Sequence, residues 1–152
     1  MLSLSVDEYK KIANERRPDV VKASAERTFS LAKADYVNLY ASSTTYPGRI
    51  AQNDLEKDTL LLQIAQRKAT QEIAANYEKV NQAKQALEKS SESQKSAAQR
   101  YHETYRDYLN ENASAAELAD QAEKWLDSIA DRIDSAYQYN VAVATLQYSA
   151  GF

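Results

Sequence analysis

The chain has 152 residues, of which 27% are charged, and its formal net charge is −3. That length supports one domain with a continuous buried seam, and the charge lacks the basic excess typical of nucleic-acid binding. Cysteine is absent, which excludes disulfides, thiolate metal sites and thiol catalysis. Only two glycines and two prolines occur among many good helix formers. We therefore expect an all-α protein with a single helical domain over 1–152.

The first two helices are predicted over about 5–15 and 18–41. Ser5 and Glu8 have the spacing of a capping box, in which each side chain satisfies a free backbone N–H at a helix start. Pro18 has no N–H and fits best as the first residue of a new helix, so we expect a kink just before it. Apolar residues at spacings of three and four predict the buried face of the second helix: Val21, Ala25, Phe29, Ala32, Tyr36 and Leu39.

Two connections are predicted beyond that helix. The first covers 42–52, where Pro47 and Gly48 suit the central positions of a type II turn. The second covers 110–113, where asparagine tolerates the left-handed conformation that ends many helices. So short a connection forces the helices on either side of it to run antiparallel.

The last two helices are predicted over 53–109 and 114–149. Asn53 and Ser114 are each followed three residues later by a glutamate, which is the pattern of a helix cap. The seam of the third helix is predicted at Leu62, Ala65, Ala69, Ile73, Val80, Ala83 and Leu87. That of the fourth is predicted at Ala122, Leu126, Ile129, Ile133, Ala136, Val143 and Leu146, until Gly151 ends the helix.

The expected architecture is a long antiparallel coiled-coil hairpin with a shorter, kinked N-terminal helix. Many seam positions are alanine, which buries little apolar area per residue. Such a seam requires great length or additional partners.

Three segments resemble the outer membrane efflux protein family, the TolC-like channel-tunnels. They are Arg-Arg-Pro-Asp-Val-Val-Lys-Ala at 16–23, Ala-Glu-Leu-Ala-Asp at 116–120 and Ala-Tyr-Gln-Tyr-Asn at 136–140. The resemblance implies a duct whose repeats each contain a short helix, a membrane β-hairpin, a long helix and a returning helix. Here the link at 41–50 stands where that β-hairpin belongs, and it is too short, since each membrane strand needs about 9–11 residues. We expect a barrel-deleted fragment or a reduced relative that does not insert into a membrane by itself.

The resemblance also implies location and partners. It places the chain in the periplasm or outer membrane of a Gram-negative bacterium, although no signal peptide is expected at its start. Copies would associate into a ring or bundle, and a periplasmic adaptor would dock at the hairpin tip. The partner-binding tip residues would be Tyr105, Arg106, Tyr108, Asn110, Asn112 and Ala116. The membrane-proximal end would include Tyr40, Tyr46, Pro47, Tyr148 and Phe152, because tyrosine is enriched at membrane interfaces.

No catalytic, cofactor or metal site is predicted, and we do not expect an enzyme. His102 is the only histidine, and its neighbours Glu103, Arg106 and Asp107 point in different directions on a helix. An acidic series on the last helix is predicted to be an exposed face, which in a channel would line the lumen or meet a basic partner helix: Asp120, Glu123, Asp127, Asp131 and Asp134. Trp125 is expected to pack across the hairpin against the region of Tyr101 and Tyr105.

A second function remains open on the sequence alone. The chain could be a free-standing coiled-coil scaffold or a BAR-like protein that binds a membrane surface. The BAR-like version requires cations along one face, whereas here lysine and arginine are dispersed among acids.

Overall fold

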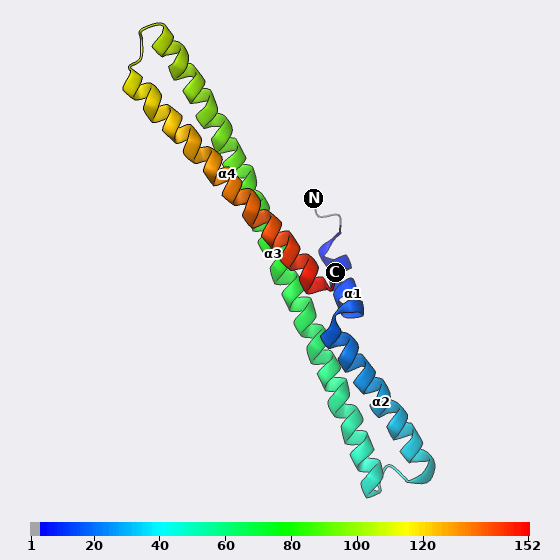
Figure 1. Cartoon of the computed structure of the whole chain (residues 1–152). Coiled ribbons are helices and arrows are strands. Elements are labelled where there is room, and N and C mark those ends of the chain that lie inside the picture. The colour runs from blue at the N-terminus through cyan, green and yellow to red at the C-terminus, as the bar shows by residue number, and fades with distance from the viewer. Residues whose placement is uncertain (1–3) are drawn as a thin grey trace. The chain divides into compact units, whose positions relative to one another are not determined.

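The computed structural model describes residues 4–152 and contains, over that range, four helices and no strand (Figure 1). The helices are α1 (Val6–Arg16), α2 (Pro18–Tyr40), α3 (Tyr46–Leu109) and α4 (Ala115–Ala150). The predicted all-α class is confirmed. The contacts divide the chain into two compact units. One unit comprises the chain up to Tyr77 with Thr145–Phe152, and the other comprises Glu78–Ala144.

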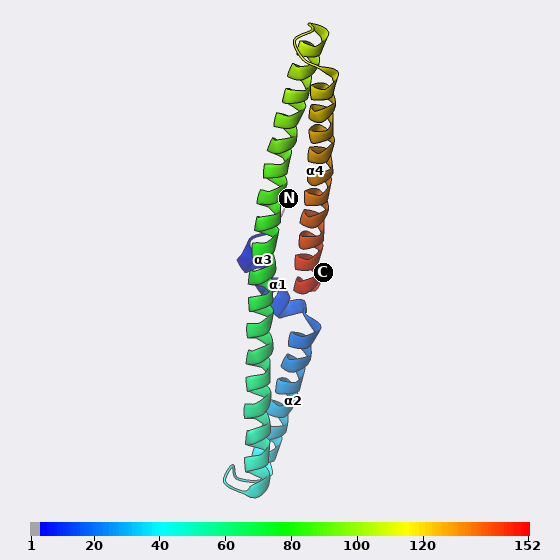
Figure 2. The ribbon, with the colours of Figure 1, turned by 90° about the vertical axis from the view of Figure 1, so that its left-hand side faces the viewer.

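In the first unit, α2 runs antiparallel to the N-terminal half of α3 (Figures 1 and 2). The seam between them consists mostly of small side chains that let the two backbones approach closely: Val20, Ala23 and Ala34 of α2, and Ala51, Ala69 and Ile73 of α3. The register is fixed by two polar contacts. Ser30 donates a hydrogen bond to Asp58 at 2.5 Å, and Lys33 pairs with Asp54 at 2.7 Å.

The seam of α2 lies on a different face from the one predicted. Each of the residues predicted to be buried is exposed: Val21, Ala25, Phe29, Ala32, Tyr36 and Leu39. Phe29 is 72% exposed, whereas Val20 and Ala34 of the true seam are 2% and 4% exposed. The prediction followed the larger apolar side chains, but a close helix pair selects the smaller ones. Helix α2 therefore has two apolar faces, and only the face with the small residues is used within the chain.

The start of the chain follows the predicted local signals. Glu8 accepts hydrogen bonds from the Ser5 backbone N–H at 2.6 Å and from its hydroxyl, and the predicted capping box is confirmed. The Ser5 backbone N–H lowers the pKa of the Glu8 carboxyl, and the Ser5 hydroxyl adds to the effect. Helix α1 ends at Arg16, Arg17 is extended, and Pro18 begins α2, so the predicted kink is confirmed.

Helix α1 is held in the first unit by aromatic contacts. The ring of Tyr9 packs edge-on against Tyr77 and Phe152, with centroids 6.4 and 6.2 Å away. Gly151 ends α4 with a φ of 87°, as predicted. The position that a side chain would occupy at Gly151 lies beside Arg16. A Cβ at Gly151 would lie 3.2 Å from the Cβ of Arg16, so both the backbone and the packing favour glycine here.

The first connection is shorter than predicted. It runs from Ala41 to Thr45, not over 42–52, because α3 already begins at Tyr46. Pro47 and Gly48 form no type II turn. They lie in the first turn of α3, where proline loses no hydrogen bond. The predicted cap at Asn53 is also wrong, since that residue lies inside the helix. Gly48 is required for space, because a Cβ there would lie 2.3 Å from the carbonyl oxygen of Ser42.

The second unit is a hairpin of α3 and α4 around a stacked aromatic pair. The rings of Tyr101 and Trp125 stack at 5.0 Å, which confirms the contact predicted across the hairpin. Ser114 and Glu117 form the predicted capping box, with the Ser114 N–H donating to Glu117 at 2.7 Å. The predicted seam of α4 is only partly correct, because two of its large residues are exposed instead: Leu126 (63%) and Ile133 (65%).

The tip of this hairpin turns at Glu111. Its φ of 61° is left-handed, and no other non-glycine residue between 4 and 152 has a positive φ. We expected an asparagine of the 110–113 connection to take this conformation. Glutamate has no short side chain to compensate for the crowding of its Cβ, so the turn is strained there.

Replacing Glu111 by glycine should relieve this strain. We expect Glu111→Gly to raise the free energy of unfolding by about 0.5–1 kcal/mol, because glycine adopts positive φ without a clash. Thermal unfolding followed by circular dichroism would measure the gain. The matched control is Asn112→Gly, at the next position, which has no positive φ and should lose stability or stay unchanged. An equal rise in the free energy of unfolding in both variants would contradict the interpretation that the backbone is strained at Glu111.

Candidate functional site

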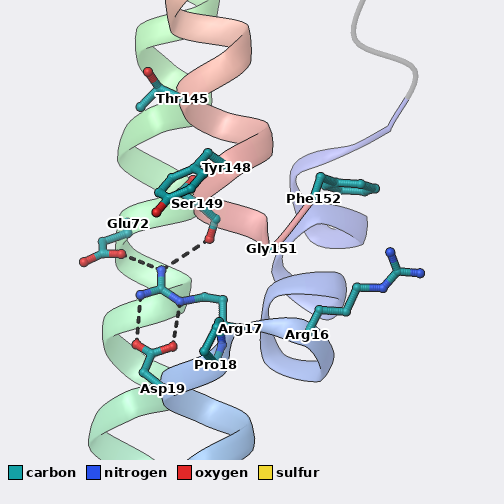
Figure 3. Close-up of a pocket in the computed structure, with 10 residues that line it drawn as sticks. All are labelled: Arg16, Arg17, Pro18, Asp19, Glu72, Thr145, Tyr148, Ser149, Gly151 and Phe152. Carbon is teal, nitrogen blue, oxygen red and sulfur yellow. Dashed lines mark hydrogen bonds and ion pairs between the residues drawn. The ribbon is translucent and has the colours of Figure 1, made fainter.

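A polar junction built on Arg17 joins three helices of the first unit (Figure 3). The Arg17 guanidinium forms a two-point ion pair with Asp19, with contacts of 3.0 and 2.9 Å. It also pairs with Glu72 of α3 and donates a hydrogen bond to the carbonyl oxygen of Ser149 at 3.3 Å. Ser149 lies in the last turn of α4, where free carbonyl groups carry partial negative charge. One cation therefore holds the start of α2, the middle of α3 and the end of α4.

The charges at this junction shift one another's titration. Hydrogen bonding to Asp19 raises the pKa of Arg17 against the opposing effect of burial, and Glu72 adds to the rise. The same hydrogen bond lowers the pKa of the Asp19 carboxyl. The Arg17 side chain is only 13% exposed, whereas Asp19 and Glu72 are 42% and 41% exposed. Arg17 is thus the buried centre of the cluster.

A cavity of about 630 Å³ lies beside the junction, and Figure 3 shows the residues that line it. Its walls include the exposed ring of Tyr148 and the ring of Phe152, which lies 5.6 Å from the guanidinium carbon of Arg16. Both side-chain carboxylates that line the cavity, Asp19 and Glu72, are paired with Arg17. This geometry supports a structural role, the joining of helix ends, rather than chemistry on a substrate.

Larger apolar surfaces lie on the outside of the helices. The outer face of α2 consists of Val21, Ala25, Phe29 and Ala32. The outer patch of α3 consists of Leu60, Leu61 and Ile64, which are 57%, 42% and 60% exposed. In the second unit, the outer face of α4 consists of Leu126, Ala130, Ile133, Tyr137 and Ala144. Exposed apolar residues that line up along one face of a helix are candidates for an interaction surface.

In the first unit, the outer surfaces lie nearly opposite the seam on both α2 and α3. A helix advances about 100° per residue, so Phe29 and Ala32 point away from Val20 and Ala34 on α2. The same spacing sets Leu60 and Ile64 opposite Ala69 and Ile73 on α3. A helix with two opposite apolar faces is suited to the middle of a layer of helices, with one neighbour on each side.

The outer face of α2 and the outer patch of α3 lie at the same height in the first unit. The hydrogen bond from Ser30 to Asp58 fixes the register of the antiparallel pair, and therefore Phe29 lies level with Leu60. A second copy placed alongside without a shift would bring one surface to the height of the other.

The six residues predicted for the partner-binding tip are brought together in the second unit. Tyr105, Arg106 and Tyr108 lie in the last turns of α3, Asn110 and Asn112 in the connection, and Ala116 in the first turn of α4; all six are exposed. The backbone of the connection is well ordered by hydrogen bonds. The N–H of Asn112 donates to the carbonyl of Asp107 at 2.8 Å. An exposed, rigid turn of this kind can present side chains to a partner.

The predicted membrane-proximal residues fall in two separate places in the first unit. Tyr40, Tyr46 and Pro47 lie around the connection between α2 and α3. Tyr148 and Phe152 lie instead at the Arg17 junction, at the opposite end of α2. The prediction placed them together because it assigned the end of the last helix to the same level as the first connection. The residues at the connection remain candidates for membrane contact.

The residues considered for chemistry are exposed on the surfaces of α3 and α4. His102 is exposed and its ring lies 6.0 Å from that of Trp125. The acidic series of α4 is exposed, as predicted: Asp120, Glu123, Asp127, Asp131 and Asp134. Within residues 4–152, no three histidine, aspartate or glutamate side chains gather as metal ligands would. No helix in the described part of the chain is long and apolar enough to cross a membrane.

The chain matches no known protein-family model and no curated protein sequence. The resemblance to the TolC-like family therefore depends on the sequence segments quoted above, and the function has to be argued from the surfaces of this chain.

The importance of the junction can be tested by removing its cation. We expect Arg17→Gln to lower the free energy of unfolding by about 1–2 kcal/mol, because Glu72 and the α4 carbonyls lose a buried donor. The lowered pKa of Asp19 means that its ion pair stabilises the fold above pH 3.8 and is lost as the pH falls further. The difference between wild type and variant should therefore shrink in acid.

The matched control is Lys22→Gln, which breaks an exposed ion pair with Glu26 at 3.8 Å. Such pairs contribute little, and we expect no measurable change. Equal effects of the two substitutions in urea unfolding would contradict a special role for Arg17.

Proposed function

We propose that this chain is a wall element of a TolC-like outer-membrane efflux or secretion duct. Copies associate side by side through the outer surfaces of their helices and form an α-helical barrel in the periplasm. The observation that carries the proposal is the pair of opposite apolar faces on α2 and on the N-terminal half of α3. One face of each is buried in the seam between the two helices, and the other is left exposed.

The geometry of the faces favours an open layer over a closed bundle. In a compact bundle, the apolar faces of a helix lie close together, because all of them point to one core. Opposite faces need a neighbour on each side, and repeated contacts of this kind form a ring where the rotation between copies closes and an open filament where it does not. We propose the ring. The equal height of Phe29 and Leu60 supports a contact in which α2 of one copy packs against α3 of the next.

The tip of the second unit supports the docking of a periplasmic adaptor. Tyrosine and arginine are the side chains that most often dominate protein interfaces, and Tyr105, Arg106 and Tyr108 are exposed beside the turn. The exposed acidic series of α4 is consistent with a water-filled lumen or with a basic partner.

Self-association tests the proposal most simply. We expect the wild-type chain to form ring-like oligomers in light scattering and sedimentation. Phe29→Glu and Ile64→Glu should each weaken assembly by roughly 100-fold, because each places a charge in an apolar contact. Helical content should remain unchanged, since neither residue packs in the seam.

The matched control is Gln63→Glu, which adds the same charge at an exposed polar position beside Ile64. It should leave assembly intact. A strictly monomeric wild-type chain at high concentration, or a closed dimer insensitive to both substitutions, would overturn the proposal. A closed dimer would instead favour a coiled-coil scaffold.

A further inference from the structure

The end of the first unit at the connection between α2 and α3 has an unusual surface. Four large side chains there are among the most exposed in the chain: Tyr36 (64%), Leu39 (75%), Tyr40 (77%) and Tyr46 (73%). The rings of Tyr36 and Tyr40 lie 5.2 Å apart. We refer to residues 36–50 as the aromatic end. These side chains project from the two helix termini that flank the connection, so they surround a single tip.

Charge is nearly absent from the aromatic end. Arg49 is the only charged residue between positions 36 and 50, where the average composition of the chain would give about four. The depletion is local, because Asp35 directly precedes it and Asp54 and Glu56 follow soon after. A surface exposed to water on all sides has no physical reason to exclude charge in this way. Loss of charge together with exposed aromatic residues indicates contact with a less polar medium.

The centre of the tip is polar without being charged. Thr45 donates its hydroxyl to the Ser42 carbonyl at 2.6 Å, and the hydroxyls of Ser42 and Thr44 lie 3.0 Å apart. These residues are exposed, as is Ser43. The buried centres of protein interfaces are depleted in serine, whereas the headgroup layer of a bilayer accepts hydroxyl groups. Tyrosine combines an apolar ring with a hydroxyl and is enriched in that same layer.

We propose that the aromatic end is an interfacial membrane anchor that inserts its tyrosines and Leu39 into the headgroup region of a lipid bilayer. It lies on the surface and does not span the bilayer, in keeping with the absence of a spanning helix among residues 4–152. Tyr36 and Leu39 continue the exposed stripe of α2, whereas Tyr40 and Tyr46 belong neither to the outer face of α2 nor to the outer patch of α3. Substitution of these two tyrosines therefore tests the anchor separately from the proposed assembly.

Because Arg49 is the only charged residue of the aromatic end, the binding of this anchor should depend little on lipid charge and salt. Basic amphipathic anchors need anionic lipids and detach as salt screens the attraction. Arg49 alone supplies little attraction, so the anchor should bind vesicles of neutral phosphatidylcholine and should stay bound in high salt.

Flotation with phosphatidylcholine vesicles tests the proposal on the full chain. Wild type should float with the vesicles, and the double variant Tyr40→Ser with Tyr46→Ser should lose roughly tenfold or more of this binding. The matched control is Tyr105→Ser with Tyr108→Ser, which removes two exposed tyrosines from the other hairpin end and should bind like wild type. Circular dichroism would verify that both variants are folded.

Fluorescence gives a second readout that does not require loss of binding. Trp125 is the only tryptophan, and its ring is stacked on Tyr101. In a Trp125→Phe background, the indole introduced by Tyr40→Trp should be quenched by brominated lipids. Trp125 of the wild-type chain should not be quenched.

Three results would overturn the proposal that the aromatic end anchors the chain to a membrane. One is failure of the wild-type chain to float with any vesicle. Another is equal loss of flotation in the two double variants. The third is a fall in oligomer mass with unchanged vesicle binding in Tyr40→Ser with Tyr46→Ser, which would assign the aromatic end to a second copy of the chain.

Discussion

The pair formed by α2 and the N-terminal half of α3 buries a narrow seam of mostly small side chains, and the other features of the first unit depend on this choice. Alanines such as Ala34, Ala51 and Ala69 allow two backbones to approach closely, but they remove little apolar area from water. The larger apolar residues of these two helices are left on other faces, where Phe29 and Leu60 are exposed. A chain built in this way gains much of its burial only when neighbours cover those faces. This is the physical basis for proposing assembly.

Polar contacts select one register of α2 against α3, which the alanine seam alone would not do. Small residues fit together in several registers, whereas the contacts of Ser30 with Asp58 and of Lys33 with Asp54 select one. At the start of α2, Arg17 pairs with Glu72 and donates a hydrogen bond to a carbonyl of α4. Because the register also sets the outer surfaces to a common height, these contacts influence how a second copy could pack.

Local signals were predicted well from the sequence, whereas long-range contacts were predicted only in part: the contact of Trp125 with Tyr101 is confirmed, and the seam of α2 is not. The Ser5 and Ser114 capping boxes, the break at Pro18 and the end at Gly151 depend on neighbouring residues, and each is confirmed. The seam of α2 was assigned to the wrong face, because a helix with two apolar faces gives two stripes of similar period. Asn53 resembled a cap but lies inside α3, since Tyr46 and Pro47 can already start the helix. The left-handed residue is Glu111, whereas the prediction chose one of the neighbouring asparagines because asparagine adopts this conformation more readily. Of the candidate sites, the hairpin tip could be predicted from its turn, whereas the outer surfaces required the structure.

The most direct test of lateral packing uses the absence of cysteine from the sequence. A chain carrying Phe29→Cys and a second chain carrying Leu60→Cys would be mixed and oxidised, and disulfide-linked pairs would be measured on a denaturing gel. Packing of α2 from one copy against α3 of the next, without a shift in height, predicts rapid formation of the mixed pair and little cross-linking when either chain is oxidised alone. Cross-linking of each chain only with itself, or none at concentrations where oligomers form, would contradict the account.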